Sequence, residues 1–160
     1  MPSNKPIRIL IVDDHFIGRI GLLTALNLAS DMCVVGEAST GSQALTLYPQ
    51  HRPDVVLMDL HLPDLSGLET TAALCRNHPG AKVIVLSTFD AVEDLPQAFQ
   101  AGARGFVFKD VLGEELFQAI RTVQAGGRHV PAEIGRNLPA ELPGSELAPT
   151  PGVLPTQVPG

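Results

Sequence analysis

Large aromatic rings and cysteines are scarce in this sequence: its 160 residues include no tryptophan, one tyrosine and two cysteines. Proteins that hold single-stranded nucleic acid stack its bases on aromatic side chains, so this composition argues against that class. Cys33 and Cys75 lie far apart along the chain, each among apolar residues. That setting predicts two reduced thiols in the core, and it argues against a disulfide or a cysteine metal site.

Basic residues and long apolar runs are also scarce. The 11 Lys and Arg are outnumbered by 17 Asp and Glu, and the resulting net charge of −6 disfavours non-specific binding to nucleic-acid phosphates. No apolar run approaches the roughly 20 residues of a membrane-spanning helix. The first apolar run is short and leads into acidic residues, unlike a signal peptide. We therefore expect a cytoplasmic protein without a membrane partner.

Short apolar runs rich in β-branched residues alternate with longer segments of helical period. The runs IRILIV, CVVGEA, DVVLMD, KVIVLS and RGFVF predict buried strands at 7–12, 33–38, 54–59, 82–87 and 104–108. Helices are expected at 15–29, 41–50, 66–77, 93–101 and 112–126. This alternation predicts an α/β fold, a doubly wound parallel sheet of five strands with helices on both of its faces.

Local signals refine the expected helix ends. Thr40 has the side chain of an N-cap for the second helix, and Gly102 can end the fourth. Pro96 falls inside the fourth helical segment and is tolerated only in a first turn, so we expect that helix to begin near Asp94 or Leu95.

The composition changes after Arg136. Residues 137–160 contain 6 of the 14 prolines, no Lys or Arg, and no apolar period. We expect one folded domain over 5–130, followed by a flexible, proline-rich tail or linker over 131–160.

Polar side chains stand where four of the five expected strands end. They are Asp13 and Asp14 after the first, Asp59 at the third, Ser87 at the fourth and Lys109 at the fifth. Any one of them alone would be an ordinary solvated group, but the carboxyl ends of parallel strands meet at one edge. Three converging carboxylates predict a hard cation, and Mg²⁺ is the natural choice. A nearby ammonium and hydroxyl would hold an anion, so the pattern predicts a carboxylate, Asp59, that becomes phosphorylated.

The segments IRILIVDDH, DVVLMDLHLPDLSG, VIVLSTFD and AGARGFVFKD resemble the motifs of receiver domains of bacterial two-component response regulators. The pattern is most similar to the subgroup that usually carries a helix-turn-helix of the LuxR/NarL type. The resemblance covers about residues 5–130 and implies a flavodoxin-like sheet with strand order 2-1-3-4-5.

The resemblance also implies a role for each matching residue. Asp13, Asp14, Asp59 and the backbone carbonyl of His61 would hold Mg²⁺. Asp59 would receive a phosphoryl group from a sensor histidine kinase. The chain would thus be a signalling domain whose only catalysis is its own phosphorylation and dephosphorylation.

A conformational switch follows from the same resemblance. Ser87 and Lys109 would bind the phosphoryl oxygens, and Phe106 would be the switch aromatic. Because Phe106 has no hydroxyl, burial alone would favour its inward position. We also expect the bulky side chain of Phe89 to screen hydrolytic water and slow dephosphorylation.

The first helix suggests a partner surface. The arc expected to face the sheet contains Ile17, Leu22, Ala25 and Leu28. Ile20 and Leu23 fall on the opposite side, where they are either ordinary surface residues or an association face. The hypothesis is a symmetric homodimer through this helix.

Several functions remain open for such a chain. Its output is either transcription, through a DNA-binding domain absent from these residues, or protein contacts made by a stand-alone receiver. The chain has no basic recognition helix, so we do not expect it to bind DNA itself. A haloacid-dehalogenase-like phosphatase would need a second acid two residues after Asp59, where His61 stands. A flavin carrier would need a phosphate-binding loop in place of the acidic one that follows the first strand.

Overall fold

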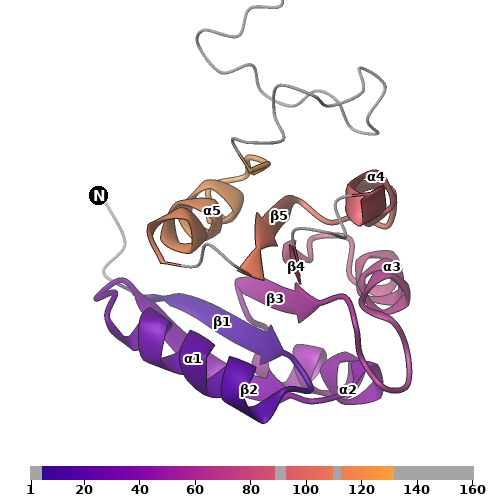
Figure 1. The fold of residues 1–160 in the computed structure, drawn as a ribbon, viewed down its shortest axis with the longest axis horizontal. Helices are drawn as coiled ribbons and strands as arrows, with labels where there is room; N and C mark the ends of the chain where they lie inside the picture. The colour runs from indigo at the N-terminus through magenta and orange to yellow at the C-terminus, as the bar shows by residue number, and fades with distance from the viewer. Residues whose placement is uncertain (1–4, 89–92, 110–112, 132–160) are drawn as a thin grey trace, which may run out of the picture.

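The computed structural model describes residues 5–88, 93–109 and 113–131. Five strands form one parallel sheet in the order β2-β1-β3-β4-β5 (Figure 1). The strands are β1 (Ile7–Val12), β2 (Met32–Ala38), β3 (Val55–Asp59), β4 (Val83–Ser87) and β5 (Gly105–Phe108). The helices are α1 (Phe16–Asn27), α2 (Gly41–His51), α3 (Gly67–Asn77), α4 (Leu95–Gln100) and α5 (Glu114–Gln124). The predicted fold and strand order are therefore confirmed.

Two hydrophobic layers hold the helices to the sheet. Alternate side chains of β1 face opposite ways, so that Leu10 and Val12 join one layer while Ile9 and Ile11 join the other. Helices α2, α3 and α4 cover the first layer, and α1 and α5 cover the second. Strands β3, β4 and β5 are buried along their whole length, as their unbroken apolar sequences predict.

Helix boundaries follow the local signals. The Thr40 hydroxyl accepts a hydrogen bond from the backbone N–H of Gln43 and caps α2, as predicted. Helix α4 begins at Leu95, with Pro96 in its first turn. Gly102 follows α4 with a φ of 113°, and a Cβ there would lie 2.7 Å from Cys75 Sγ, so this turn requires glycine. Cys75 is a free thiol.

Helix α1 turns a different face to the sheet from the one predicted. Leu22 and Leu26 are its buried residues, whereas Ile17 is 76% exposed and Leu28 is 79% exposed. At 100° per residue, Ile17 lies half a turn away from Leu26, and Leu28 is the C-cap, beyond the last full turn. The prediction for Ile17 and Leu28 was wrong, since the apolar residues of α1 are spread too evenly to identify its core stripe.

The two residues proposed as a dimer face differ from each other. Ile20 is 42% exposed, which agrees with the prediction. Leu23 is only half-buried and packs against the core layer under α1, so its predicted exposure was wrong. None of the helices in the described part of the chain is long and apolar enough to cross a membrane.

Candidate functional site

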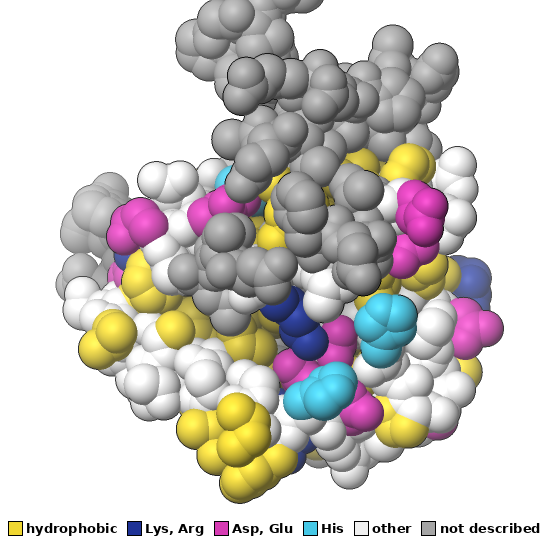
Figure 2. All heavy atoms as spheres, in the orientation of Figure 1, with side chains coloured by type: hydrophobic (Ala, Val, Ile, Leu, Met, Phe, Trp, Pro, Cys, Tyr) yellow, Lys and Arg dark blue, Asp and Glu magenta, His cyan; other side chains and the backbone are white. Residues whose placement is uncertain are grey.

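Carboxylates from β1 and β3 meet at the carboxyl edge of the sheet. Asp13 follows β1, Asp59 is the last residue of β3, and both are almost completely buried. Asp14 is exposed beside them. Ligand atoms of these three residues and of His15 all lie within 4.8 Å of one another. Figure 2 shows acidic, basic and histidine side chains gathered on this face.

One ammonium group lies against the carboxylates. Lys109 directly follows β5, and its Nζ is 3.3 Å from Asp59 Oδ2 and 3.8 Å from Asp13 Oδ2. Its side chain is itself 25% exposed, so the pair is only partly screened by water. The structure thus brings together residues from three different strands, as the sequence predicts.

His15 is the member of the cluster to which sequence reasoning assigned no role. Its Nδ1 lies 3.1 Å from Asp14 Oδ1, 3.2 Å from Asp13 Oδ1 and 3.7 Å from Asp59 Oδ2. Its backbone N–H donates to Asp13 Oδ1 at 2.8 Å, which fixes the start of α1 beside the carboxylates. The only signal in the sequence is its position directly after the two acids.

The buried oxygens of this cluster fit a divalent cation. Asp13 Oδ2 and Asp59 Oδ2 accept no hydrogen bond from the residues that the structure describes, although both are buried. Burial raises the pKa of the Asp59 carboxyl; Lys109 opposes that increase, and Asp13 adds to it. Buried carboxylate oxygens without donors are costly unless a cation neutralises them. Oxygen ligands of this kind suit Mg²⁺.

Comparison with known proteins identifies the family. Residues 9–121 match the family model of the response regulator receiver domain. The chain belongs to this receiver family. Its sheet order, 2-1-3-4-5, and its acidic edge are those expected of such a domain.

Curated proteins similar to this receiver are named as response regulators or transcriptional regulators. It is 39% identical to the response regulator GacA of Pseudomonas aeruginosa over 132 residues, which cover 82% of this chain and 62% of GacA. It is 39% identical to the transcriptional regulatory protein YxjL of Bacillus subtilis, over 78% of this chain and 57% of that protein. The chain therefore spans about three fifths of the length of these curated relatives.

A solved structure has the same fold. The two-component response regulator of the LuxR family from Aurantimonas is 34% identical to this receiver and superimposes with a TM-score of 0.78. The match covers 82% of this chain and 94% of that one. The subgroup suggested by the sequence motifs is thus supported by this relative of the LuxR family.

The residues expected to act as the switch of the receiver lie on β4 and β5. Ser87 ends β4 and is almost completely buried, and among the described residues its hydroxyl donates one long bond, of 3.4 Å, to the carbonyl of Thr88. Phe106 is fully buried on β5 and packs edge-to-face on Phe108, with ring centroids 5.8 Å apart. The aromatic ring is therefore in its inward position. Phe89 lies outside the described residues.

The loop after Asp59 is held tightly at one point by a glycine. A Cβ on Gly67 would lie 2.2 Å from the carbonyl oxygen of Asp59 and 2.6 Å from the Cα of Leu60. The Gly67 N–H donates to the Leu60 carbonyl at 2.8 Å, closing the loop. The backbone N–H of His61 points back to Asp59 Oδ1 at 3.4 Å. The metal-ligand role of the His61 carbonyl stays a prediction.

A second clamp on this loop was missed by sequence reasoning. Asp64 Oδ1 accepts from the N–H of Gly41 at 2.8 Å, and Oδ2 accepts from the N–H and hydroxyl of Ser42 at 3.0 and 2.6 Å. The Ser42 hydroxyl, with backbone donors, holds the pKa of the Asp64 carboxyl well below its usual range. The loop is thereby attached to the first turn of α2. Nothing local in the sequence predicts a contact across more than 20 residues.

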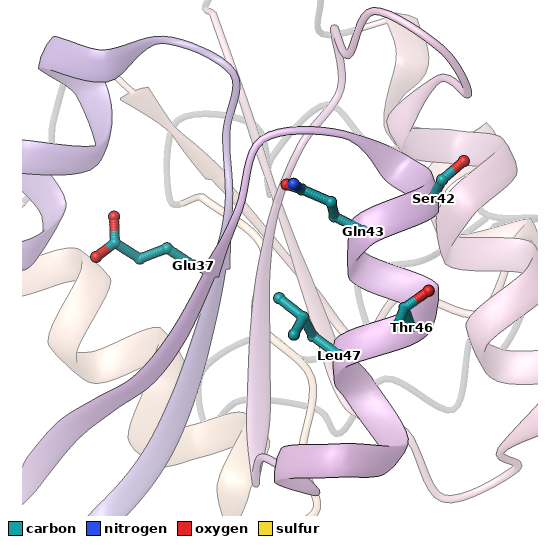
Figure 3. A pocket seen from close by; sticks show the side chains of 5 residues that line it. All are labelled: Glu37, Ser42, Gln43, Thr46 and Leu47. Atoms are coloured by element: carbon teal, nitrogen blue, oxygen red, sulfur yellow. The ribbon is translucent and has the colours of Figure 1, made fainter.

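A depression lies between β2 and α2. Its lining residues are Glu37, Ser42, Gln43, Thr46 and Leu47 (Figure 3). The Gln43 amide oxygen accepts from Ser39, and Glu37 pairs with Arg19 at 3.3 Å. With Ser42 engaged by Asp64, its main polar groups are already paired within the chain.

Proposed function

We propose that this receiver accepts a phosphoryl group on Asp59 in a Mg²⁺-dependent reaction and transmits the change to an output. The observation that carries the proposal is the buried Asp59 carboxylate with the Lys109 ammonium 3.3 Å away. In such a pair the carboxylate is the nucleophile, and the neighbouring ammonium can neutralise the negative charge that the carboxylate gains with the phosphoryl group.

The metal would be held by Asp13, Asp14, Asp59 and the backbone carbonyl of His61. When bound, Mg²⁺ would neutralise negative charge on the oxygens of the phosphoryl group during its transfer. The buried Oδ2 atoms of Asp13 and Asp59, which accept no hydrogen bond from the described residues, support this assignment. Lys109 is close enough to both to share the same neutralising task.

In the transfer step, a carboxylate oxygen of Asp59 attacks the phosphorus, and the bond between phosphorus and the donor breaks. With a phosphohistidine donor, a P–N bond breaks and the electron pair leaves with the imidazole, which takes up a proton. Lys109 and Ser87 hold the phosphoryl oxygens. Hydrolysis of the acyl phosphate by water returns the receiver to its resting state.

The charge of nearly −2 on the phosphoryl group drives the switch. Within the described part of the chain, the Ser87 hydroxyl has one long hydrogen bond to give up, which leaves it available to the phosphoryl oxygens. Its movement stabilises the inward position of Phe106 on the neighbouring strand. This is a local charge event that shifts the population of two states.

Partners and output are proposed from the family and its relatives. The phosphoryl donor is a cytoplasmic sensor histidine kinase. The output is transcription, through a DNA-binding domain outside these residues, because regulatory relatives extend well beyond the part matched here. We place the receiver itself at residues 5–130 and a linker at 131–160; residues 132–160 are outside the described part of the chain.

Intact-mass spectrometry tests the phosphoacceptor directly. After incubation with Mg²⁺ and acetyl phosphate, we expect one phosphoryl adduct on the wild-type chain. Asp59→Asn has no nucleophilic oxygen at that position and should give no adduct, and EDTA should abolish the adduct of the wild type. A full adduct on a folded Asp59→Asn variant would show that the acceptor lies elsewhere.

A homodimer through α1 is the proposed assembly. Ile20 is 42% exposed beside the more exposed Phe16 and Ile17, and apolar side chains grouped in this way favour association. Ile20→Glu should lower the mass in sedimentation from that of a dimer to that of a monomer. Thr46→Glu adds the same charge on the exposed side of α2 and should leave the mass unchanged. A wild-type chain that sediments as a monomer, phosphorylated or not, would exclude this assembly.

A further inference from the structure

After α5 the chain reverses and returns along the outer edge of β5. Gly126 has a φ of 102°, and its N–H donates to the Val123 carbonyl at 3.0 Å. The Gly127 N–H donates to the Thr122 carbonyl at 2.9 Å. These bonds end the helix with a glycine in the left-handed region and point residues 128–131 back at the sheet.

Residue 129 then pairs with β5 as an additional strand would. The N–H of His129 donates to the Arg104 carbonyl at 3.0 Å, and the N–H of Phe106 donates to the His129 carbonyl at 3.1 Å. The two bonds form a parallel bridge between Gly105 and His129. The backbone of the expected switch residue, Phe106, is thus directly bonded to the chain that leaves the domain.

Side chains hold the same segment in place. His129 Nε2 lies 2.9 Å from Glu115 Oε2 in the first turn of α5, and the two side chains are only 15% and 23% exposed. Val130 packs against the core layer that contains Phe106, and Pro131 is buried. Phe106 is therefore joined to the segment by its backbone N–H, and its ring belongs to the core layer against which Val130 packs.

We propose that residues 128–131 form a strap that senses the inward position of Phe106 and transmits it to the chain that follows, with the His129–Glu115 pair as its latch. The sensing role rests on the proposed function, because Phe106 must respond to phosphorylation of Asp59. Anything that follows residue 131 is connected to the receiver through this strap.

The direction of the effect follows from the contacts. In the structure Phe106 is inward and the strap is docked, so the two states occur together. Phosphorylation favours the inward ring and should therefore favour the docked strap. Coupling between two equilibria is reciprocal, so a docked strap favours phosphoryl loading by the same factor by which loading favours docking, and loosening the strap weakens loading.

Amide exchange on the unphosphorylated full chain tests the latch. Glu115→Gln keeps the shape of the side chain but replaces the charged acceptor by a neutral one, and should speed exchange of the His129 and Phe106 amides about fivefold, the ratio between a charged and a neutral hydrogen bond. Glu114→Gln is the matched control: it removes a neighbouring first-turn charge from an exposed residue and should leave both amides unchanged. Equal rates in all three proteins would overturn the latch.

A double substitution separates the latch from a general loosening of α5. His129→Phe removes the bond and should speed exchange of the same two amides at least as much as Glu115→Gln does. The double variant should be no faster than His129→Phe alone, because the two substitutions act on one interaction. Additive acceleration, or faster exchange throughout α5, would mean that the pair does not act as a latch.

Loading with beryllofluoride and Mg²⁺ tests the sensing role. Fluorine NMR reports occupancy of the site, independently of the strap. We expect slower exchange of the His129 and Phe106 amides on loading, and Glu115→Gln should need several-fold more beryllofluoride for half-saturation. Full occupancy without either effect overturns the strap and leaves the proposed function standing. Absence of a bound-fluoride signal overturns the proposed function and, with it, the sensing role.

Discussion

Helices α3 and α4 follow the two strands that carry Asp59 and Ser87, yet they are anchored very differently. Helix α3 has 11 residues and a complete capping box, in which Ser66 and Glu69 bond each other's backbone N–H groups at 3.0 Å. Helix α4 has 6 residues, no side-chain cap at Asp94 and a proline in its first turn. The helix on the Asp59 side of the site is thus firmly capped, whereas in the described residues the helix on the Ser87 side is short and lacks a side-chain cap.

The largest expected loss of stability comes from a substitution at Gly67, where α3 begins on the Asp59 side of the site. In Gly67→Ala, the new methyl group meets backbone atoms of Asp59 and Leu60 that cannot move without distorting β3. We expect a loss of about 3 kcal/mol in the free energy of unfolding, measured by urea denaturation. Gly21→Ala is the control, because a Cβ there meets nothing within 4 Å, and alanine in a helix is favourable by up to about 1 kcal/mol. Equal stability of the two variants would contradict the crowding around Gly67.

A smaller loss of stability is expected from removing the side-chain cap of α3, and it tests the comparison with the uncapped α4. Ser66→Ala removes the hydroxyl that caps α3 and should cost about 1 kcal/mol. Asp94→Ala, at the equivalent position of α4, removes no side-chain cap bond and should change stability by less than about 0.5 kcal/mol. The measurement is again the urea midpoint at neutral pH. A larger loss in Asp94→Ala would show that α4 is as firmly capped as α3.

The smallest expected change in stability depends on pH and comes from the hydrogen bonds that Asp64 accepts from α2. The bonds from Ser42 and the backbone lower the pKa of Asp64 in the folded state, so its contribution to stability is fully present above the unfolded pKa, about 4. That contribution is lost as the pH falls below this value toward the lower folded pKa. Wild type should therefore exceed Asp64→Asn in urea midpoint at pH 7, and the difference should shrink below about pH 4. A difference that stays constant down to pH 3 would show that the charge of Asp64 does not contribute.

Sequence reasoning predicts the features that are local or periodic. Buried parallel strands are continuous apolar runs, and their carboxyl ends converge, so the amino-acid sequence alone was enough to group the site residues Asp13, Asp59 and Lys109. The face of α1 could not be predicted, because apolar side chains occur all around that helix. The contacts of Asp64 with α2 and of His129 with β5 join residues that are distant in the sequence and that only the folded chain brings together.

The bridge at His129 also has a consequence for where the domain can be cut. Strand β5 lies at one edge of the sheet, and residue 129 covers part of its backbone. The opposite edge, β2, is interrupted by a register shift against β1 and carries the charged Glu37. Both devices discourage pairing with a strand of another molecule. A shorter chain that ends at α5 would leave β5 unprotected, so its solubility should be lower than that of a chain which retains the bridge.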